Sequence, residues 1–304
     1  MNFTAKDVQA LREKTGVGMM DCKKALASAD GDMDKAIDFL REKGLAAAAK
    51  KSGRIAAEGI VYTYYDDEAK CGVMVEVNSE TDFVAKNEEF QNFVKNVAKT
   101  IAVSNPADLD ALAAAKLYGS DRTVAENLQD KILSIGENQK IRRFVRMDGV
   151  VSTYIHGMGR IGVMVQFETT PEVAAKPEFA EYGKDIAMQI AAINPLFLNK
   201  ESVPAETLEY EKKIMTEQVL GEGKPAAIAD KIVAGKINKY YKENCLIDQV
   251  FVKNNDLTVS GYTAEVAKNL GGDIVIKGFL RFERGEGLEK KADNFADEVA
   301  SMIK

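Results

Sequence analysis

One stretch of this 304-residue chain occurs twice, and this repeat limits what the chain can fold into. Residues 59–64 return as residues 149–154, and residues 72–75 return as residues 162–165, at a constant offset of 90 residues (149 − 59 and 162 − 72). Each copy holds two short runs rich in β-branched and aromatic residues, which favour strands. A pattern of apolar residues at helical spacing follows each pair of runs. The repeat therefore predicts a duplicated unit of two strands and a helix.

The segments that join strand to helix differ between the two copies. The helices align after a shift of one residue, so that Phe90 and Phe93 face Phe179 and Tyr182. In the preceding segment Val84-Ala85-Lys86 aligns with Ala174-Ala175-Lys176, which places Thr81-Asp82-Phe83 opposite Pro171-Glu172-Val173.

Phe83 is therefore open to two interpretations. A lone Phe at a strand-to-helix corner usually covers the core, because large apolar side chains are mostly buried. The second copy carries Val173 at the aligned position, which indicates that the unit folds without a Phe there. We expect Phe83 to be an exposed anchor for a partner, since binding residues collect on loops held by rigid elements.

The remaining segments predict an α+β protein. Residues 1–43 have the pattern of three short helices, with Thr4 capping the first and Asp30-Gly31-Asp32 turning into the third, and an Ala-rich helical linker follows. Repeated hairpins that carry helices indicate two small antiparallel sheets, each with helices on one face, and residues 274–283 are expected to be the third strand of the second sheet. Residues 203–242 predict an inserted helical hairpin whose seam is formed at heptad-like spacing by Leu208, Met215, Val219, Ile228, Ile232, Val233, Ile237 and Tyr241.

Three signatures in order resemble one family. They are Thr-Asp-Phe-Val-Ala-Lys-Asn at residues 81–87, the block at residues 11–26, and Tyr-Ile-His-Gly-Met-Gly-Arg-Ile-Gly-Val at residues 154–163. Together they resemble the bacterial elongation factor Ts family, over nearly the whole chain. Two positions depart from the family pattern, because Met158 stands where glycine is usual and Gln139 interrupts a Gly-Glu-Asn-Ile motif.

The resemblance implies a domain plan. An N-terminal three-helix domain of the ubiquitin-associated (UBA) type spans residues 1–53 and touches a partner GTPase. The duplicated core has its first half at residues 54–143 and its second half at residues 144–202 and 244–283. The helical hairpin takes residues 203–243, and a C-terminal helical module takes residues 284–304, with an amphipathic helix from Lys290 onward.

The resemblance also implies a set of partner-binding residues. Thr81, Asp82, Phe83 and Val84 would enter the GTPase, named elongation factor Tu, and dislodge its magnesium ion. Other contacts would come from Arg12, Met19, Met20, Lys23, Ile135 and His156. From the residues alone, Met19 and Met20 are equally consistent with core filling, and a lone His beside glycine-rich turns is more often structural.

Several classes of function are disfavoured by composition. His156 is the only histidine, which removes Ser-His-Asp and Cys-His chemistry unless that residue serves, and no nucleotide-binding glycine loop follows a strand. A formal charge of −6 argues against nucleic acid as the main partner. The widely spaced Cys22, Cys71 and Cys245 indicate reduced thiols, and no apolar run approaches a membrane span. We expect a cytoplasmic protein without cofactor, metal or bound nucleotide.

The function that the resemblance implies is guanine-nucleotide exchange without covalent chemistry. The factor would bind elongation factor Tu with GDP and stabilise its nucleotide-free state. The alternative is a UBA-like interaction adaptor that does not change nucleotide release. Whether the helical hairpin forms a homodimer stays open at this point.

Overall fold

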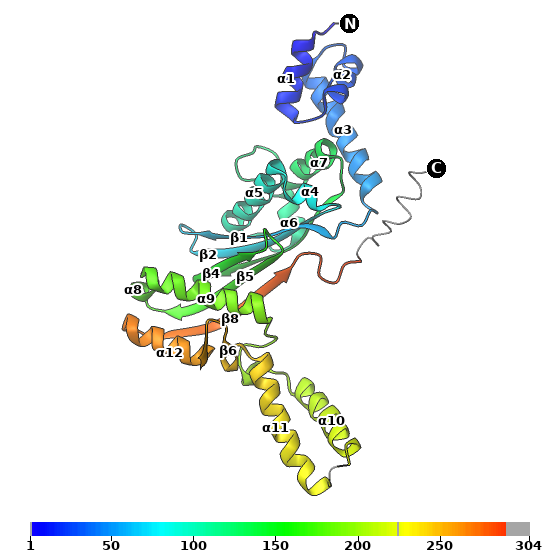
Figure 1. Ribbon diagram of the computed structural model, residues 1–304. Coiled ribbons are helices and arrows are strands. Elements are labelled where there is room, and N and C mark those ends of the chain that lie inside the picture. Colours follow the sequence, from blue (N-terminus) through cyan, green and yellow to red (C-terminus); the bar gives the residue numbers. More distant parts are fainter. Residues whose placement is uncertain (1, 224, 290–304) are drawn as a thin grey trace.

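The computed structural model describes residues 2–223 and 225–289 of the chain, and its α+β class agrees with the sequence prediction (Figure 1). The C-terminal helix expected from Lys290 onward lies outside the described residues.

The N-terminal domain is a bundle of three helices with its own small core. Thr4 begins the first helix with a capping box to Asp7, and Gly16 ends it in a left-handed conformation with φ of +68°. Apolar residues of the three helices meet in a core that includes Leu11, Leu26 and Leu40. The third helix is longer than predicted, because the Ala-rich segment expected as a separate linker continues it without a break. The helices are α1 (Ala5–Thr15), α2 (Met19–Ser28) and α3 (Met33–Lys51).

The core contains two three-stranded antiparallel sheets that repeat one topology. In each sheet a hairpin is followed much later in sequence by a third strand that pairs with the hairpin's second strand. The first sheet has the order β1 (Glu58–Asp66), β2 (Cys71–Ser79), β3 (Gln139–Asp148), and the second has the order β4 (Val150–His156), β5 (Ile161–Thr169), β8 (Ile274–Glu283). The prediction for residues 274–283 is thus confirmed. Strand β3 was not predicted, and the expected limit between the halves at residues 143 and 144 falls within it.

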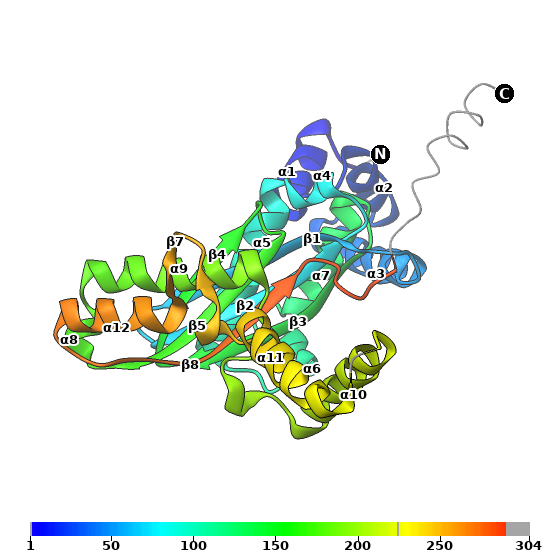
Figure 2. The same cartoon turned by 60° about the horizontal axis from the view of Figure 1, so that its bottom comes forward.

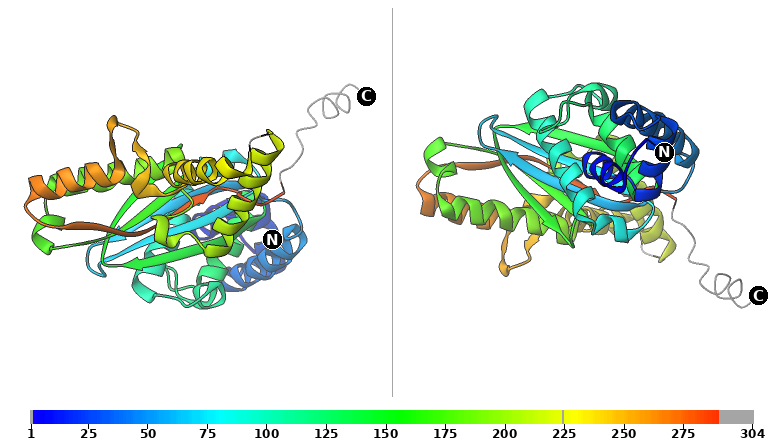
Figure 3. Two further views of the ribbon diagram at one scale, coloured as in Figure 1. Left: turned by 90° about the horizontal axis from the view of Figure 1, so that it is seen from below. Right: turned by 90° about the horizontal axis from the view of Figure 1, so that it is seen from above.

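Helices cover the outer face of each sheet. Valines of β2 pack under α5 (Glu88–Ser104), and valines of β5 pack under α9 (Pro177–Ile193). Three further helices complete the first half and two complete the second. Figure 3 shows the strands lying between these two helical layers. The additional elements are α4 (Asp82–Ala85), α6 (Leu109–Ala114), α7 (Val124–Ile135), α8 (Pro171–Ala174), α12 (Val259–Leu270), β6 (Val250–Phe251) and β7 (Asn254–Thr258).

The inner faces of the sheets meet through two glycines related by the repeat. A Cβ on Gly72 would lie 2.5 Å from Val151 Cγ1, and a Cβ on Gly162 would lie 2.5 Å from Val61 Cγ1. Such a distance is far shorter than van der Waals contact, so only glycine allows this approach. Because residues 72 and 61 correspond to 162 and 151 at the offset of 90, the interface consists of the same contact made twice. This arrangement is what an approximate twofold axis between the halves requires.

The inserted hairpin extends away from the core in Figure 1 and comes towards the viewer in Figure 2. Helices α10 (Ala205–Gly221) and α11 (Ala226–Asn244) pack through most of the predicted seam, but the place of Ile228 in it is wrong, since this side chain is 46% exposed. At its root the amides of Leu196 and Phe197 donate to the carbonyl of Asn244. The hairpin is thus self-packed and joined to the core at one end.

The two ends of the core lie side by side. After β8 the chain returns to the first sheet, where Gly285, at φ of +69°, packs so close to Ala57 that a Cβ would lie 2.3 Å from its carbonyl oxygen. Leu288 then shares one surface hollow with Arg54 and Ile55, at the start of the core. The segment that enters the core and the segment that leaves it are therefore neighbours.

We expect alanine at either inter-sheet glycine to destabilise the core. Overpacking of this kind costs about 1–3 kcal/mol, so Gly72→Ala and Gly162→Ala should both lower the free energy of unfolding measured with denaturant. Gly278→Ala is the matched control, because this strand glycine has no atom within 4 Å of an added Cβ. Adding Val151→Ala to Gly72→Ala should recover part of the loss. Equal stability of the Gly72 and Gly278 variants would contradict the close approach.

Candidate functional site

Phe83 is an exposed aromatic residue on a short helix at the end of β2. Its side chain is 78% exposed, whereas the neighbouring Val84 is 6% exposed and belongs to the core under α5. Lys86 Nζ lies 2.7 Å from Asp82 Oδ2 and 5.8 Å from the centroid of the Phe83 ring. The hydrogen bond from Lys86 lowers the pKa of Asp82. The interpretation of Phe83 as a core residue is therefore wrong.

The turn that carries Phe83 is fastened to the loop after α7 by two carboxylates. Glu137 accepts hydrogen bonds from the backbone amide of Thr81 at 3.0 Å and from its hydroxyl at 2.7 Å. In the reverse direction, Glu80 Oε1 accepts from the amide of Asn138 at 2.6 Å. Because each segment supplies an acceptor for the other's backbone, the turn is held firmly while the ring of Phe83 stays exposed.

The structural counterpart of Phe83 in the second copy is Glu172, and the predicted counterpart, Val173, is wrong. Thr81 and Thr170 are the N-cap residues of α4 and α8, and Val84 and Val173 are buried three residues after them. The one-residue shift thus occurs before the turn, because Glu80 is an extra residue after β2. The sequence alignment of the two copies is wrong here because it pairs Val84 with Ala174, whereas the pattern of burial pairs Val84 with Val173.

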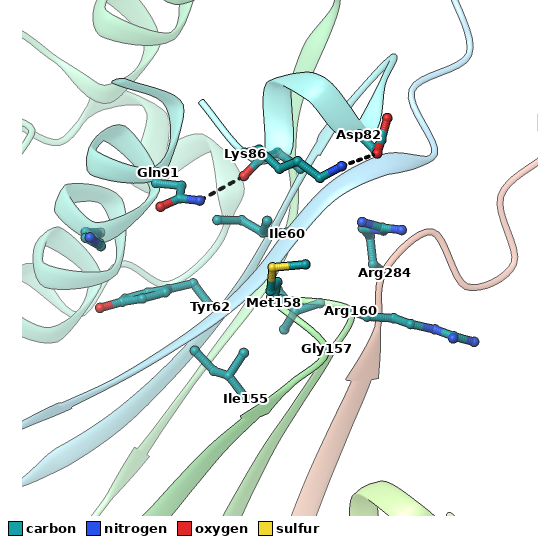
Figure 4. A pocket seen from close by; sticks show the side chains of 14 residues that line it. Ile60, Tyr62, Asp82, Lys86, Gln91, Ile155, Gly157, Met158, Arg160 and Arg284 are labelled. Carbon is teal, nitrogen blue, oxygen red and sulfur yellow. Dashed lines mark hydrogen bonds and ion pairs between the residues drawn. The ribbon is translucent and has the colours of Figure 1, made fainter. Parts of the chain in front are cut away.

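A groove of about 470 Å³ opens beside this turn, between the two halves of the core. Figure 4 shows Asp82 of α4 and the following Lys86 on one side and the turn from β4 to β5 on the other. Apolar side chains that include Ile60, Tyr62 and Ile155 line its interior. Sequence reasoning missed this groove because its sides come from segments far apart in the chain. The available signal was the Gly157-Met158-Gly159 sequence, whose glycines predict a tight turn.

His156 and Ile135 lie at two different borders of this region. His156 ends β4 next to the turn that lines the groove, and its exposed ring has Nδ1 at 3.1 Å from the hydroxyl of Tyr154. Ile135 ends α7, two residues before Glu137, and its half-buried side chain packs against the first core. His156 therefore adjoins the turn that lines the groove, and Ile135 adjoins the loop that holds the turn of Phe83.

The predicted residues of the three-helix domain form a separate exposed surface. Met19 and Met20 are 42% and 63% exposed, so the core-filling interpretation is wrong for both. Lys23 is exposed on the same helix, α2, and Arg12 is exposed on α1. The domain contacts the core through α7, where Arg41 pairs with Glu126 at 2.9 Å and Leu133 packs against the helical bundle.

Two kinds of site are absent from the described part of the chain. Residues 2–223 and 225–289 place no group of three or more His, Cys, Asp or Glu side chains where they could hold a metal ion. Within the same residues, none of the helices combines the length and the apolar character that crossing a membrane demands.

Comparison with known proteins identifies the family. The family model described as "Elongation factor TS" matches residues 80–286. The chain belongs to the elongation factor Ts family. Elongation factor Ts of Clostridium kluyveri is 53% identical over 305 residues, and that of Clostridium perfringens is 55% identical over 303 residues, in each case covering 99% of both chains. Elongation factor Ts of Syntrophotalea carbinolica is 52% identical over 307 residues and covers all of both chains.

Membership of the elongation factor Ts family gives the chain a role in translation elongation. The matched region begins at Glu80, which is the residue that fastens the turn to Asn138. The relatives extend the similarity over the three-helix domain, which precedes the matched region.

We expect Glu137→Ala to loosen the turn without unfolding the protein. The substitution removes the acceptor of two hydrogen bonds to Thr81 at a site outside the hydrophobic cores. Hydrogen exchange should report this as an acceleration of at least about tenfold at the Thr81 amide, since local opening then no longer breaks a bond to a charged acceptor worth about 1.5 kcal/mol or more. Glu88→Ala, at the exposed start of α5, is the control. Unchanged protection at Thr81 would show that Glu137 does not hold the turn.

Proposed function

We propose that this chain binds elongation factor Tu carrying GDP and promotes release of the nucleotide by stabilising the nucleotide-free GTPase, which then rebinds GTP. The observation that carries the proposal is Phe83, a 78% exposed aromatic side chain on a turn that both Glu80 and Glu137 fasten. Family membership supplies the partner and the role in translation.

An exposed Phe on a firmly held turn is suited to entering another protein. Burying an aromatic side chain is strongly favourable, and a pre-organised turn loses little conformational entropy on binding. If only the nucleotide-free GTPase accommodates the ring, this chain and GDP each weaken the other's binding to the GTPase. The free energy of this weakening is the same in both directions. Thr81 and Asp82 direct the approach of Phe83, and buried Val84 anchors the short helix. Displacement of the GTPase segments around its magnesium ion then removes charge that neutralises the phosphates.

Further contacts would let the factor hold one part of the partner while Phe83 acts on another. The three-helix domain offers Met19 and Met20 with Arg12 and Lys23 around them, and its attachment to α7 keeps it apart from the groove. His156 and Ile135 border the region around Phe83 and provide additional contacts. No bond is made or broken in this scheme, so the chain acts by binding alone.

The proposal places the protein in the cytoplasm, where translation elongation takes place, with no nucleotide, nucleic acid or cofactor bound by the chain itself. A UBA-like adaptor would bind partners through the three-helix domain and leave GDP release unchanged. Timing the release of a fluorescent GDP analogue from elongation factor Tu, with and without this protein, separates these two functions.

We expect Phe83→Ala to abolish most of the stimulated GDP release while the protein stays folded. Loss of an aromatic anchor at an interface costs on the order of 2–4 kcal/mol, which is about 30- to 1000-fold in an equilibrium, and part of this appears in the release rate. A thermal melt should change little, because Phe83 is 78% exposed and a core Phe would instead lose about 3–5 kcal/mol.

Two variants of the same region are matched controls. Glu172→Ala changes the counterpart of Phe83 in the second copy and should leave both the melt and GDP release at wild-type values. Val84→Ala removes a buried methyl pair and should lower the melting temperature. Wild-type GDP release by Phe83→Ala would contradict the proposed role of this residue.

We also expect the helical hairpin to be dispensable for the core fold. Its helices pack on each other, and its root is joined to the core by hydrogen bonds between residues 196–198 and 244–247. Replacing residues 203–242 with a short Gly/Ser linker should leave a cooperative melt and reduce stimulated GDP release by less than about tenfold, because a non-contacting element contributes little binding energy. Complete loss of stimulation in a folded variant would place the hairpin in the partner interface.

A further inference from the structure

The turn between β4 and β5 holds an apolar residue in an unfavourable backbone conformation. Gly157, Met158 and Gly159 all have positive φ, of +59°, +52° and +89°. Side chains disfavour this region, and only glycine adopts it freely. The other non-glycine residues with positive φ in the described part of the chain are polar: Asp30, Lys70, Asn105 and Asn194. Met158 is therefore the one apolar side chain placed where the backbone favours glycine.

The side chain of Met158 does not serve the packing of the fold. It is 83% exposed, more than Phe83, so it contributes little buried surface to offset the backbone strain. Strained backbone persists where the surrounding structure enforces it, and it collects at functional sites. An exposed methionine is also an adaptable apolar contact, because its unbranched thioether adjusts to irregular surfaces.

The surrounding structure fixes the position of this turn against the first half of the core. The amide of Val61 donates a 2.8 Å hydrogen bond to the carbonyl of Gly159. A Cβ on Gly159 would lie 2.8 Å from Ile60 Cβ, so the turn lies directly on β1. Met158 is thus firmly placed, across the groove from Asp82 and Lys86 of the turn that carries Phe83 (Figure 4).

We propose that Met158 is a second apolar anchor of the docking surface, across the groove from the turn of Phe83. The inference rests on the proposed function, because its occupant is a segment of the same GTPase. Both anchors stand on backbone that is already held in place, so little conformational entropy is lost when a segment binds between them. The groove therefore selects a segment of fixed width.

The charges around the groove indicate the chemistry of that segment. Lys86, Lys95, Arg160 and Arg284 line it together with a single acid, Asp82, although the whole chain has a formal charge of −6. Lys86, Arg160 and Arg284 already pair with Asp82, Glu283 and Glu58, whereas Lys95 has no ion pair among the described residues. An apolar interior with a basic border fits a helix or loop that presents an apolar side chain flanked by carboxylates.

The experiment compares three substitutions of Met158 by melting temperature and by stimulated GDP release from elongation factor Tu. Met158→Ala removes the anchor and keeps the positive φ on a side-chain-bearing residue, so release should slow about three- to tenfold at an unchanged melting temperature. Met158→Gly removes both anchor and strain, so release should slow equally while the melting temperature rises by about 1–2 °C. Met158→Leu keeps an apolar side chain and should retain most of the wild-type rate. Lys95→Glu should slow release at low salt, and the difference from wild type should shrink as salt is raised.

The outcomes separate this inference from the proposed function. Slow release with Phe83→Ala but wild-type release with Met158→Ala would overturn the second anchor alone. Failure of the wild-type protein to accelerate release would overturn the proposed function first. Slow release with Met158→Gly only would assign the effect to the backbone and overturn the anchor. Weakened self-association of Met158→Ala in sedimentation, with normal GDP release, would replace the GTPase by a second copy of this chain and overturn the stated occupant.

Discussion

The close contact between the two sheets is the constraint on which the rest of the core depends. Gly72 and Gly162 let each sheet approach the valine and methionine side chains of the other, and the repeat makes both contacts alike. Because the sheets approach this closely, the turn at the end of β4 reaches β1 and bonds to Val61. The groove between α4 and that turn exists only through this approach. The proposed docking surface, which both halves share, is thus a consequence of the close packing at Gly72 and Gly162.

A buried carboxylate breaks the symmetry of the duplication. Glu76 is fully buried, and it accepts hydrogen bonds from the Gly285 amide at 2.8 Å and from Arg143 Nε at 2.6 Å, with Arg142 and Asn78 nearby. Burial acts to raise the pKa of Glu76, but these hydrogen bonds and the charge of Arg143 outweigh it and hold the pKa below its usual value. At the offset of 90 the second copy has Gln166, which is only half-buried. Of these two corresponding positions, only the one in the first sheet carries a buried charge, and there the segment after β8 returns to the sheet.

Much of this fold follows from the sequence, and the misses have physical causes. The repeat, the cap at Thr4 and most of the hairpin seam are patterns visible in the sequence, and the structure contains them. Strand β3 was missed because a bulge opposite Glu76 and Val77 places Ile141 and Phe144, three residues apart, on the same core face, which breaks the two-residue period of a strand. The exposure of Phe83 was inferred correctly from a wrong counterpart, since Glu80 shifts the alignment one residue earlier than the sequence indicated. The groove could not be predicted, because it joins segments such as Lys86 and Met158 that only the packing of two sheets brings together.

The adjacency of the core's two ends has a consequence for its topology. Gly285 packs on Ala57, and Leu288 shares a hollow with Arg54 and Ile55, so the path of the chain through both sheets closes almost into a ring. In a ring the position of the opening is not dictated by the packing of the sheets. A circularly permuted chain, with residue 289 joined to residue 54 and new termini at the tip of the helical hairpin, keeps every contact between strands. The three-helix domain, which precedes residue 54, is attached outside this ring, and the natural order of the core elements is one of several that this core accommodates.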